Sequence, residues 1–236
     1  YTMGGLWVDY NLMSNIGGLF ILGEANYSVH GANRLGANAL LQCLCDGYFI
    51  APKTITSWLA NSKVIDQRKI DEACKEALNS VDKKIKFLLN IKGDKPVDYF
   101  HRKLGQIMIS KCGISRNRND LKNGLEEVEI LNKDFKSNLK IPETNSGLNT
   151  ELEKALRVDD FIELSKLMIN DAIEREESCG AHFREEYQTK EGEAKRNDDL
   201  FSHIAVWKFD SYSKFHKRYS EDLTFKKIKL NTRNYK

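Results

Sequence analysis

The sequence lacks any apolar run that approaches the roughly 20 residues needed to cross a bilayer, so direct membrane insertion is not expected. It also lacks a strong charge of either sign: 37 basic and 34 acidic residues leave a formal net charge of +3, so nucleic acid is not the expected partner. Cysteines are few and have no metal-ligand spacing. They predict reduced, mostly buried thiols in a cytosol-like compartment: Cys43, Cys45, Cys74, Cys112 and Cys179.

Charged side chains are scarce in residues 1–60. This segment holds five of them and eight of the 15 glycines, whereas the rest of the chain holds 35 basic and 31 acidic residues. The first segment is therefore expected to be buried and loop-rich, and the remainder to form exposed helices. Because the sequence starts at Tyr1 with this charge-poor segment and no initiator Met, we expect a fragment. Expressed alone, it should show an exposed apolar face on residues 1–60.

Two apolar stretches in that segment predict a strand and a helix. Residues 16–22 form a short apolar run between glycines, typical of a fully buried strand, although a buried helix has the same pattern. Residues 38–50 are apolar on almost every side, which predicts a buried helix with Asn38 as its N-cap and Pro52 as its stop. A strand, a glycine-containing loop and a helix N-terminus in this order form an arrangement with which α/β proteins hold anionic ligands.

From residue 67 onward, apolar residues recur every three or four positions among charged ones, which predicts amphipathic helices over about 67–93, 100–113, 121–135 and 149–174. Residues 142–147 separate the last two, and the short connections favour an antiparallel bundle. Residues 201–209 and 223–230 partly alternate and can pair as strands. The predicted fold class is α+β and mainly α: an α/β segment over 1–60, a helical bundle over 61–175 and an irregular tail with short strands over 176–236.

The densest group of possible ligand side chains surrounds Arg34. An arginine in a nearly uncharged segment is costly to bury without an anion, and its planar fork suits a carboxylate. Two interpretations stand: Arg34 holds a substrate carboxylate, or it forms a structural ion pair with Glu24. Glu24 can also accept hydrogen bonds from a ribose or ribityl hydroxyl. His30, in the glycine-containing loop, is more typical of structural hydrogen bonding than of acid–base catalysis.

A second charged cluster lies at residues 175–184, where two arginines, two glutamates and a histidine surround Gly180. We interpret it as an ion-pair network that locks the tail onto the rest of the protein, with a part in a ligand site as the alternative. Cys43 and Cys45 fall on the predicted 38–50 helix and are interpreted as packing residues.

Four segments in order carry a specific resemblance. Y-T-M-G-G-L at 1–6, G-L-F-I-L-G-E-A at 18–25, H-G-A-N-R-L-G-A-N-A-L at 30–40 and R-E-E-S-C-G-A-H-F-R at 175–184 resemble the flavoprotein subunit of succinate dehydrogenase and fumarate reductase. The closing T-R-N-Y-K at 232–236 resembles that family's C-terminus, and F-R-E-E-Y-Q-T-K-E-G-E-A at 183–194 is similar to its bacterial, menaquinone-linked branch. The resemblance makes residues 1–60 the remnant of an FAD-binding domain.

The resemblance also implies a function. It implies FAD, hydride transfer between flavin and succinate or fumarate, and coupling to quinone through an iron–sulfur subunit and a membrane anchor subunit. The implied location is cytoplasmic, peripheral on the inner face of the bacterial inner membrane. Glu24 matches the position that binds the FAD sugar chain, Arg34 the arginine that holds a substrate carboxylate, and Ala39 and Leu40 the backbone pair that faces the flavin ring from a helix N-terminus. Amides at such a terminus stabilise negative charge.

No catalytic residue of that family matches a position of this sequence. Its proton-transferring arginine, its dinucleotide-binding glycine loop and its capping domain have no counterpart, and its histidine stands just before the position of Tyr1. We therefore expect the C-terminal part of a subunit more than twice as long, inactive by itself. Two alternatives stay open. L-aspartate oxidase shares the patterns at 1–5 and 30–34, and a non-catalytic helical interaction module would be a stable monomer without the exposed apolar face.

Overall fold

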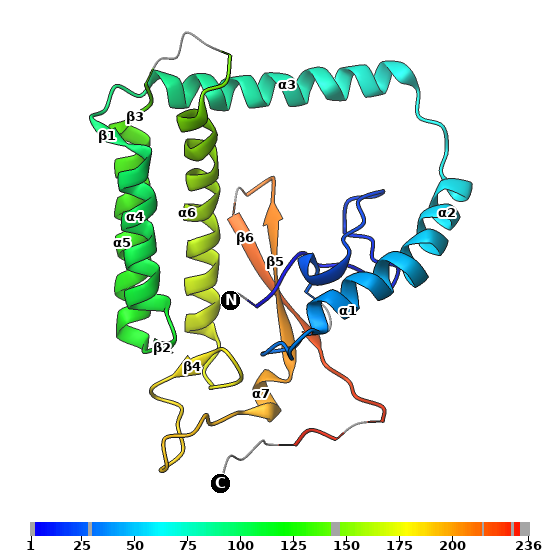
Figure 1. Ribbon diagram of the computed structural model, residues 1–236, viewed down its shortest axis with the longest axis vertical. Helices are drawn as coiled ribbons and strands as arrows, with labels where there is room; N and C mark the ends of the chain where they lie inside the picture. The colour runs from blue at the N-terminus through cyan, green and yellow to red at the C-terminus, as the bar shows by residue number, and fades with distance from the viewer. Residues whose placement is uncertain (1–2, 28–29, 143–146, 214, 228, 232–236) are drawn as a thin grey trace.

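The computed structural model describes residues 3–27, 30–142, 147–213, 215–227 and 229–231. The fold is mainly α with short strands, as the sequence predicts (Figure 1). A 3-10 turn at Gly23–Ala25 comes first, and a π-helical turn at Asp46–Ile50 joins the first two helices. The remaining elements are α1 (Asn38–Cys45), α2 (Ala51–Asn61), α3 (Gln67–Asn90), β1 (Lys95–Pro96), α4 (Val97–Cys112), β2 (Ser115–Arg116), α5 (Arg118–Asn138), β3 (Leu139–Lys140), α6 (Thr150–Glu174), β4 (Phe183–Arg184), α7 (Asp198–Phe201), β5 (His203–Asp210) and β6 (Phe215–Asp222).

Helices α4, α5 and α6 lie side by side and enclose the hydrophobic core (Figure 1). The pairing of β1 with β3 places the start of α4 beside the end of α5, so these helices are antiparallel, as their short connection predicts. The rings of Phe100 and Phe135 meet edge to face in this core, with centroids 5.2 Å apart. Asn149 caps α6 by accepting hydrogen bonds from the amides of Glu151 and Leu152.

Helix α3 forms where the periodicity predicts it, but it does not join the bundle along its length. It crosses the end of the bundle and reaches away from it (Figure 1). Its attachment lies near its C-terminal end, where Leu88 is buried and Lys84 lies 3.1 Å from Asp159 and 3.2 Å from Asp160 of α6. Apolar positions nearer its start, such as Leu78, are exposed. An amphipathic pattern thus fixes the helix but not which neighbour covers it.

The strand predicted over residues 16–22 is wrong. Within the described residues this run makes a single bridge, between Met13 and Phe20, and Ile16 is 61% exposed while Ile21 is buried. A fully buried strand needs hydrogen-bonding partners along both edges. In the described part of the chain this run has backbone partners outside itself only in residues 12–14, where the Ser14 amide donates to Leu19 and the Ile21 amide to Leu12.

The helix predicted over residues 38–50 is present, but both predicted ends are wrong. Asn38 is the first helical residue, and Ala37 stands at the N-cap position with a φ of 61°. Pro52 lies in the first turn of α2, and the chain stays helical through the π-helical turn to Asn61. A proline is tolerated in a first helical turn because the amide it lacks would have no partner there.

The prediction that this helix is buried is also wrong. The exposed apolar face predicted for residues 1–60 is confirmed in the described part of that segment. The exposed fractions reach 73% for Leu40 and 78% for Phe49, and Leu44 and Tyr48 are exposed as well. Cys43 and Cys74 are exposed thiols, contrary to the expectation of mostly buried ones. Cys112 is buried in the bundle, and burial raises the pKa of its thiol. None of the helices in the described residues is long and apolar enough to cross a membrane.

The tail contains a hairpin whose second strand differs from the prediction. β5 pairs antiparallel with β6, from His203 opposite Asp222 to Asp210 opposite Phe215, and no strand forms in the described part of 223–230. Residues 215–222 are mostly polar and have no alternating apolar pattern, but the short connection after Asp210 makes them the nearer partner for β5. The hairpin contacts α6 through Asp171, which accepts hydrogen bonds from Trp207 Nε1 (3.1 Å) and Arg218 Nε (3.3 Å). The T-R-N-Y-K segment and the first two residues of the Y-T-M-G-G segment lie outside the described residues.

Candidate functional site

Glu24 lies on the Gly23–Ala25 turn, which a buried polar network fixes against α1. Oδ2 of Asp46 accepts a hydrogen bond from the Gly23 amide at 2.8 Å. Nε2 of Gln42 donates to Oδ1 of Asn26 at 2.9 Å. Asn26 is 1% exposed, Asp46 5% and Gln42 7%, so these bonds form away from water and each partner depends on the others. The network sets the position of Glu24.

Gly23 allows the turn to come this close to the helix. Its φ is 67°, a conformation that L side chains rarely adopt, and a Cβ added there would lie 3.1 Å from Cβ of Cys43. The glycine that precedes Glu24 is therefore required by the backbone conformation and by the close packing against Cys43. The sequence gives no signal for the Asn26–Gln42–Asp46 network, because its members are far apart and belong to no motif.

Arg34 lies beside Glu24, with its Nε atom 3.6 Å from Oε1. Nη1 of Arg34 also donates to the carbonyl of Leu35 at 3.3 Å. The contact with Glu24 is longer than an ordinary hydrogen bond, and the side chains keep 27% and 37% of their surface exposed. An ion pair of this exposure contributes little to stability, so exchanging Glu24 for a ligand carboxylate would cost little. The structure thus brings together the two charged residues that the sequence singled out.

The N-terminus of α1 follows directly after Arg34 and its loop. The amide of Asn38 donates to Leu35 and that of Leu41 to Ala37, whereas the described residues offer no acceptor to the amides of Ala39 and Leu40. Among the residues that the structure describes, no side chain caps this end. Two such amides at the positive end of a helix attract negative charge. The residues present therefore fit a group with a negatively charged edge, as a reduced flavin has.

His30 is buried, with 8% of its surface exposed, at the start of the Arg34 loop. Neither ring nitrogen has a hydrogen-bond partner in the described part of the chain. The structural hydrogen bonds predicted for this side chain are therefore absent there. Leaving buried polar atoms unpaired costs about 1–3 kcal/mol, and the fold carries this cost within its candidate ligand loop.

The Arg34 loop rests on the tail. The amide of Ala181 donates to the carbonyl of Ala32 at 2.9 Å. Gly180 packs so closely beneath this point that an added Cβ would lie 2.6 Å from the carbonyl carbon of Ala32. The third and fourth of the four segments that carry the resemblance, at 30–40 and 175–184, are thus in direct contact.

The charged cluster at 175–184 is the structural network that the sequence favoured. Arg175 pairs with the buried Glu177 at 2.7 Å, and Arg184, 1% exposed, donates to the carbonyl of Ala172 at 2.7 Å. The ring of His182 lies 2.9 Å from both Arg116 Nη1, through Nδ1, and the carbonyl of Arg175, through Nε2. Since the carbonyl only accepts and the guanidinium only donates, the ring is neutral with its proton on Nε2. Burial, opposed by the Arg175 carbonyl and aided by three arginines, lowers its pKa to about 4.

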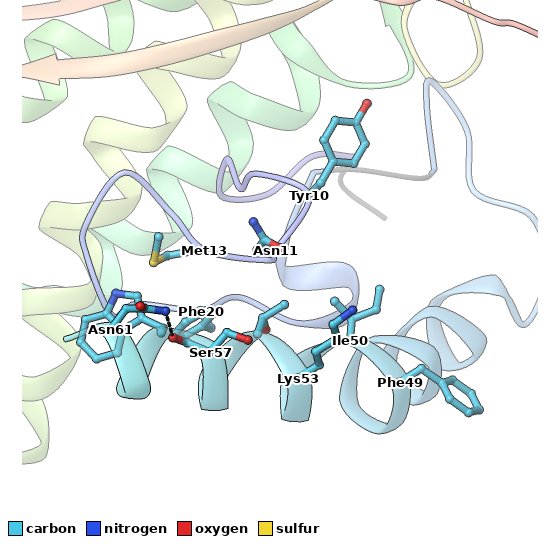
Figure 2. Close-up of a pocket in the computed structure, with 11 residues that line it drawn as sticks. Tyr10, Asn11, Met13, Phe20, Phe49, Ile50, Lys53, Ser57 and Asn61 are labelled. Atoms are coloured by element: carbon cyan, nitrogen blue, oxygen red, sulfur yellow. Dashed lines mark hydrogen bonds between the residues drawn. The ribbon is translucent and has the colours of Figure 1, made fainter.

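A pocket of about 500 Å³ lies between the loop of residues 10–20 and α2 (Figure 2). Phe20 and Trp58 meet edge to face in its wall, with centroids 6.4 Å apart, and Lys53 is the charged residue among those that line it. Figure 2 shows Asn61 bonded to the carbonyl of Ser57 at its rim, a distance of 2.8 Å. None of Glu24, Arg34, Ala39 and Leu40 lines this pocket, so it is separate from the candidate site.

The fold and the site define a flavoprotein. A family model described as FAD binding domain matches residues 1–40, which include Glu24, Arg34, Ala39 and Leu40, and indicates FAD as the cofactor. A second model, described as fumarate reductase flavoprotein C-term, matches residues 101–235, more than half of the chain. The chain belongs to this family, as the resemblance in the sequence implies.

Known proteins agree with this assignment. The succinate dehydrogenase flavoprotein subunit of Bacillus subtilis (strain 168) is 30% identical over 202 residues, covering 84% of this chain and 33% of that protein. A solved quinol fumarate reductase of Escherichia coli, mutated in its FrdA chain, matches with a TM-score of 0.83 and 27% identity over 98% of this chain and 38% of that one. A quinol-fumarate reductase with menaquinol molecules matches with a TM-score of 0.81 and 26% identity over 97% and 38%. The chain thus spans about a third of the length of these relatives.

Proposed function

We propose that this chain is the C-terminal part of an FAD-containing subunit that interconverts succinate and fumarate by hydride transfer to or from flavin. The observation that carries the proposal is the amide pair of Ala39 and Leu40, which finds no acceptor among the described residues and follows the Glu24–Arg34 pair within the stretch that matches an FAD-binding domain. The positive end of α1 suits the flavin ring, the Glu24 carboxylate suits the sugar chain of the cofactor, and the Arg34 guanidinium suits a carboxylate of the diacid.

The roles follow from the chemistry of each group. FAD, when bound, supplies the group that accepts or gives up the hydride. The amides of Ala39 and Leu40 stabilise negative charge at the edge of that ring system. The carboxylate of Glu24 accepts a hydrogen bond from a hydroxyl of the cofactor's sugar chain.

Arg34 orients the dicarboxylate. Its fork exchanges the 3.6 Å contact with Glu24 for two parallel hydrogen bonds to one ligand carboxylate, which releases Glu24 for the cofactor. Holding the diacid at both position and angle raises the rate because the reacting atoms then start close to their transition-state geometry. No proton transfer is assigned to Arg34.

The proposed partners and location are those that the resemblance implies, and the similar structures support them. Two similar structures are quinol fumarate reductases, and one is described with menaquinol. We propose that the whole protein passes electrons through an iron–sulfur subunit and a membrane anchor subunit to a menaquinone-type quinone, peripheral on the cytoplasmic face of the bacterial inner membrane. Within the chain, residues 1–60 would complete the FAD-binding domain, 61–175 form the helical domain and 176–236 the tail subdomain.

The test is an assay of the full-length gene product, purified with its flavin. Succinate with an artificial electron acceptor, fumarate with a reduced dye, and L-aspartate with oxygen are compared under the same conditions. Turnover of succinate or fumarate is expected, and residues 1–236 expressed alone should give none. Turnover of L-aspartate alone would assign the oxidase instead, and a well-behaved monomer without flavin or activity in the full-length form would favour the interaction module.

A further inference from the structure

The point of contact between the tail and the ligand loop is unusually tight. Ala32, two positions before Arg34, accepts a hydrogen bond from the Ala181 amide at 2.9 Å. Gly180 has a φ of 59°, and a Cβ placed on it would lie 2.8 Å from Cβ of Ala32 and overlap the Ala32 carbonyl oxygen. Any side chain at position 180 must therefore displace the loop or the tail.

The tail side of this contact is held firmly. Cys179 and His182 exchange backbone hydrogen bonds, with the Cys179 amide 2.8 Å from the His182 carbonyl and the reverse pair at 3.1 Å. The His182 ring joins Arg116 of β2 to Arg175, the residue that follows α6, through two bonds of 2.9 Å. The loop of residues 179–182 is thus tied to the bundle, and displacement falls on the less constrained side, the Arg34 loop.

We propose that residues 179–182 form a positioning element for the dicarboxylate: Gly180 and Ala181, acting through Ala32, set where the guanidinium of Arg34 stands. None of the three touches the ligand. The inference rests on the proposed function, because it gives Arg34 the role of orienting a carboxylate. It extends that function because the affinity for the dicarboxylate then depends on the helical bundle, to which residues 179–182, here called the brace, are tied.

Gly180→Ala in the full-length protein tests the inference, with Gly192→Ala as the matched control. Both glycines lie in the tail with positive φ, 59° and 82°, so both variants carry the same kind of backbone strain. A Cβ at Gly192 meets nothing closer than Gln188 Oε1 at 3.9 Å, whereas one at Gly180 strikes Ala32. The KM for succinate and the Kd of malonate, a non-reacting diacid followed by the flavin absorbance, should rise about 10- to 100-fold in Gly180→Ala and stay at the wild-type values in Gly192→Ala, with equal flavin content.

A second readout does not depend on turnover. Amide hydrogen exchange of peptides that cover residues 30–36 should quicken in Gly180→Ala and not in Gly192→Ala. If wild-type protein turns over neither diacid, the proposed function fails, and this exchange measurement alone decides whether the tail holds the loop. If Gly180→Ala does not accumulate, His182→Gln replaces it and should raise the same KM and Kd by weakening the brace. Gly180→Ala or His182→Gln with wild-type KM, Kd and exchange would overturn the inference.

Discussion

The indole Nε1–H of Trp7 donates a 2.8 Å hydrogen bond to Oε2 of Glu221, a residue 214 positions later in the chain. The hydroxyl of Tyr27 approaches the same carboxylate at 3.3 Å. Because the hairpin that carries Glu221 is also bonded to Asp171 of α6, the last strand ties the charge-poor first segment to the helical bundle. The charge-poor first segment is therefore attached to the bundle at two places, at Trp7 and Tyr27 through this hairpin and at Ala32 through the 179–182 loop.

We expect this link to show as a coupling between Trp7 and Glu221. In the full-length protein, Trp7→Phe and Glu221→Ala should each destabilise, and the double variant should lose less than the sum, with a coupling of about 0.5–1.5 kcal/mol for a partly exposed hydrogen bond. Chemical unfolding of the four proteins of the cycle measures it. Asp222→Ala, at the neighbouring exposed position, is the control and should not couple to Trp7→Phe. Strict additivity for Glu221 would show that the contact does not hold the segments together.

His182 should make the protein sensitive to mild acid. Burial lowers its pKa from 6.5 to about 4 in the folded protein, so the unfolded chain binds the extra proton first. Stability contributed by the neutral ring is then fully present above pH 6.5 and is lost as the pH falls through about 4. The physical event is protonation of Nδ1, which turns it from the acceptor of the Arg116 hydrogen bond into a second donor.

Unfolding midpoints in denaturant, measured from pH 7 to pH 4 on wild type and His182→Gln, test this. Between pH 7 and pH 4 the free energy of unfolding should fall by up to about 3 kcal/mol more in the wild type than in the variant. Since the acidic residues with lowered pKa values, such as Asp120 and Asp134, titrate in both proteins, the difference isolates the histidine. Parallel pH profiles would contradict the assignment of a neutral, bonded ring.

The carboxylate of Asp46 should be needed for the Glu24 turn. Asp46→Ala removes the acceptor of the buried Gly23 amide, and an unsatisfied buried donor costs about 1–3 kcal/mol. Asp46→Asn keeps an acceptor oxygen and should recover most of the loss when that oxygen takes the place of Oδ2, toward which Nδ2 of Asn26 and Nε2 of Gln42 also point, each at 3.4 Å. The measurement is the unfolding free energy together with the flavin content of the purified full-length protein. Equal loss in both variants would mean that charge, and not the hydrogen bond, is the essential property of Asp46.

Local patterns in the sequence predicted the helical half of the fold. Helices α3 to α6 form where continuous amphipathic segments predict them, because the spacing of those segments depends only on the helical repeat. The predictions for the apolar residues of 1–60 were wrong because they concerned burial, which is not a local property. Burial of residues 16–22 or of Leu40 depends on neighbours far along the chain, which spacing does not record. β6 was misplaced because its residues 215–222 are mostly polar and lack the alternating pattern that residues 223–230 show in part.

The candidate site was predictable where charge is scarce. Arg34 and Glu24 stand out in a nearly uncharged segment, and the structure places them 3.6 Å apart, the geometry of the ion-pair alternative. The buried residues that hold them were not predictable. Asn26 and Asp46 are 20 positions apart, and Arg116 meets His182 across 66 positions, distances at which a single sequence carries no pairing signal.

Arg34 and Glu24 should respond differently to substitution in the full-length enzyme. Arg34→Lys keeps the charge but loses the planar fork, so kcat/KM for succinate should fall about 10- to 100-fold, as loss of a charge-assisted hydrogen bond worth about 1.5–3 kcal/mol implies. Glu24→Gln should leave the KM for succinate near the wild-type value and lower the affinity for FAD. Steady-state kinetics and flavin titration of the apoprotein separate the two. A Glu24→Gln enzyme with the same defect as Arg34→Lys would show that the pair acts as one structural unit.

Exposed apolar side chains of α1 and of the π-helical turn that follows it make the isolated chain, residues 1–236, a test of whether another part of the complete protein covers this face. Leu40, Leu44, Tyr48 and Phe49 each keep more than half of their surface exposed, and a contiguous apolar patch of this kind binds hydrophobic dyes and promotes association. We expect strong dye fluorescence from the isolated chain. Leu44→Glu should reduce it markedly, because a charge in the centre of the patch is poorly covered by dye or by a second molecule.

The matched control is Leu78→Glu on α3, an exposed leucine outside α1 and the π-helical turn (66% exposed, against 55% for Leu44), which should reduce the fluorescence less. In the full-length protein the same two variants test stability instead of dye binding. Leu44→Glu should then destabilise strongly, by the few kcal/mol that burying an unpaired charge costs, if the rest of the FAD-binding domain covers this face. Equal tolerance of Leu44→Glu in both forms would mean that the face is open in the complete protein as well, and would weaken the assignment of residues 1–60 to that domain.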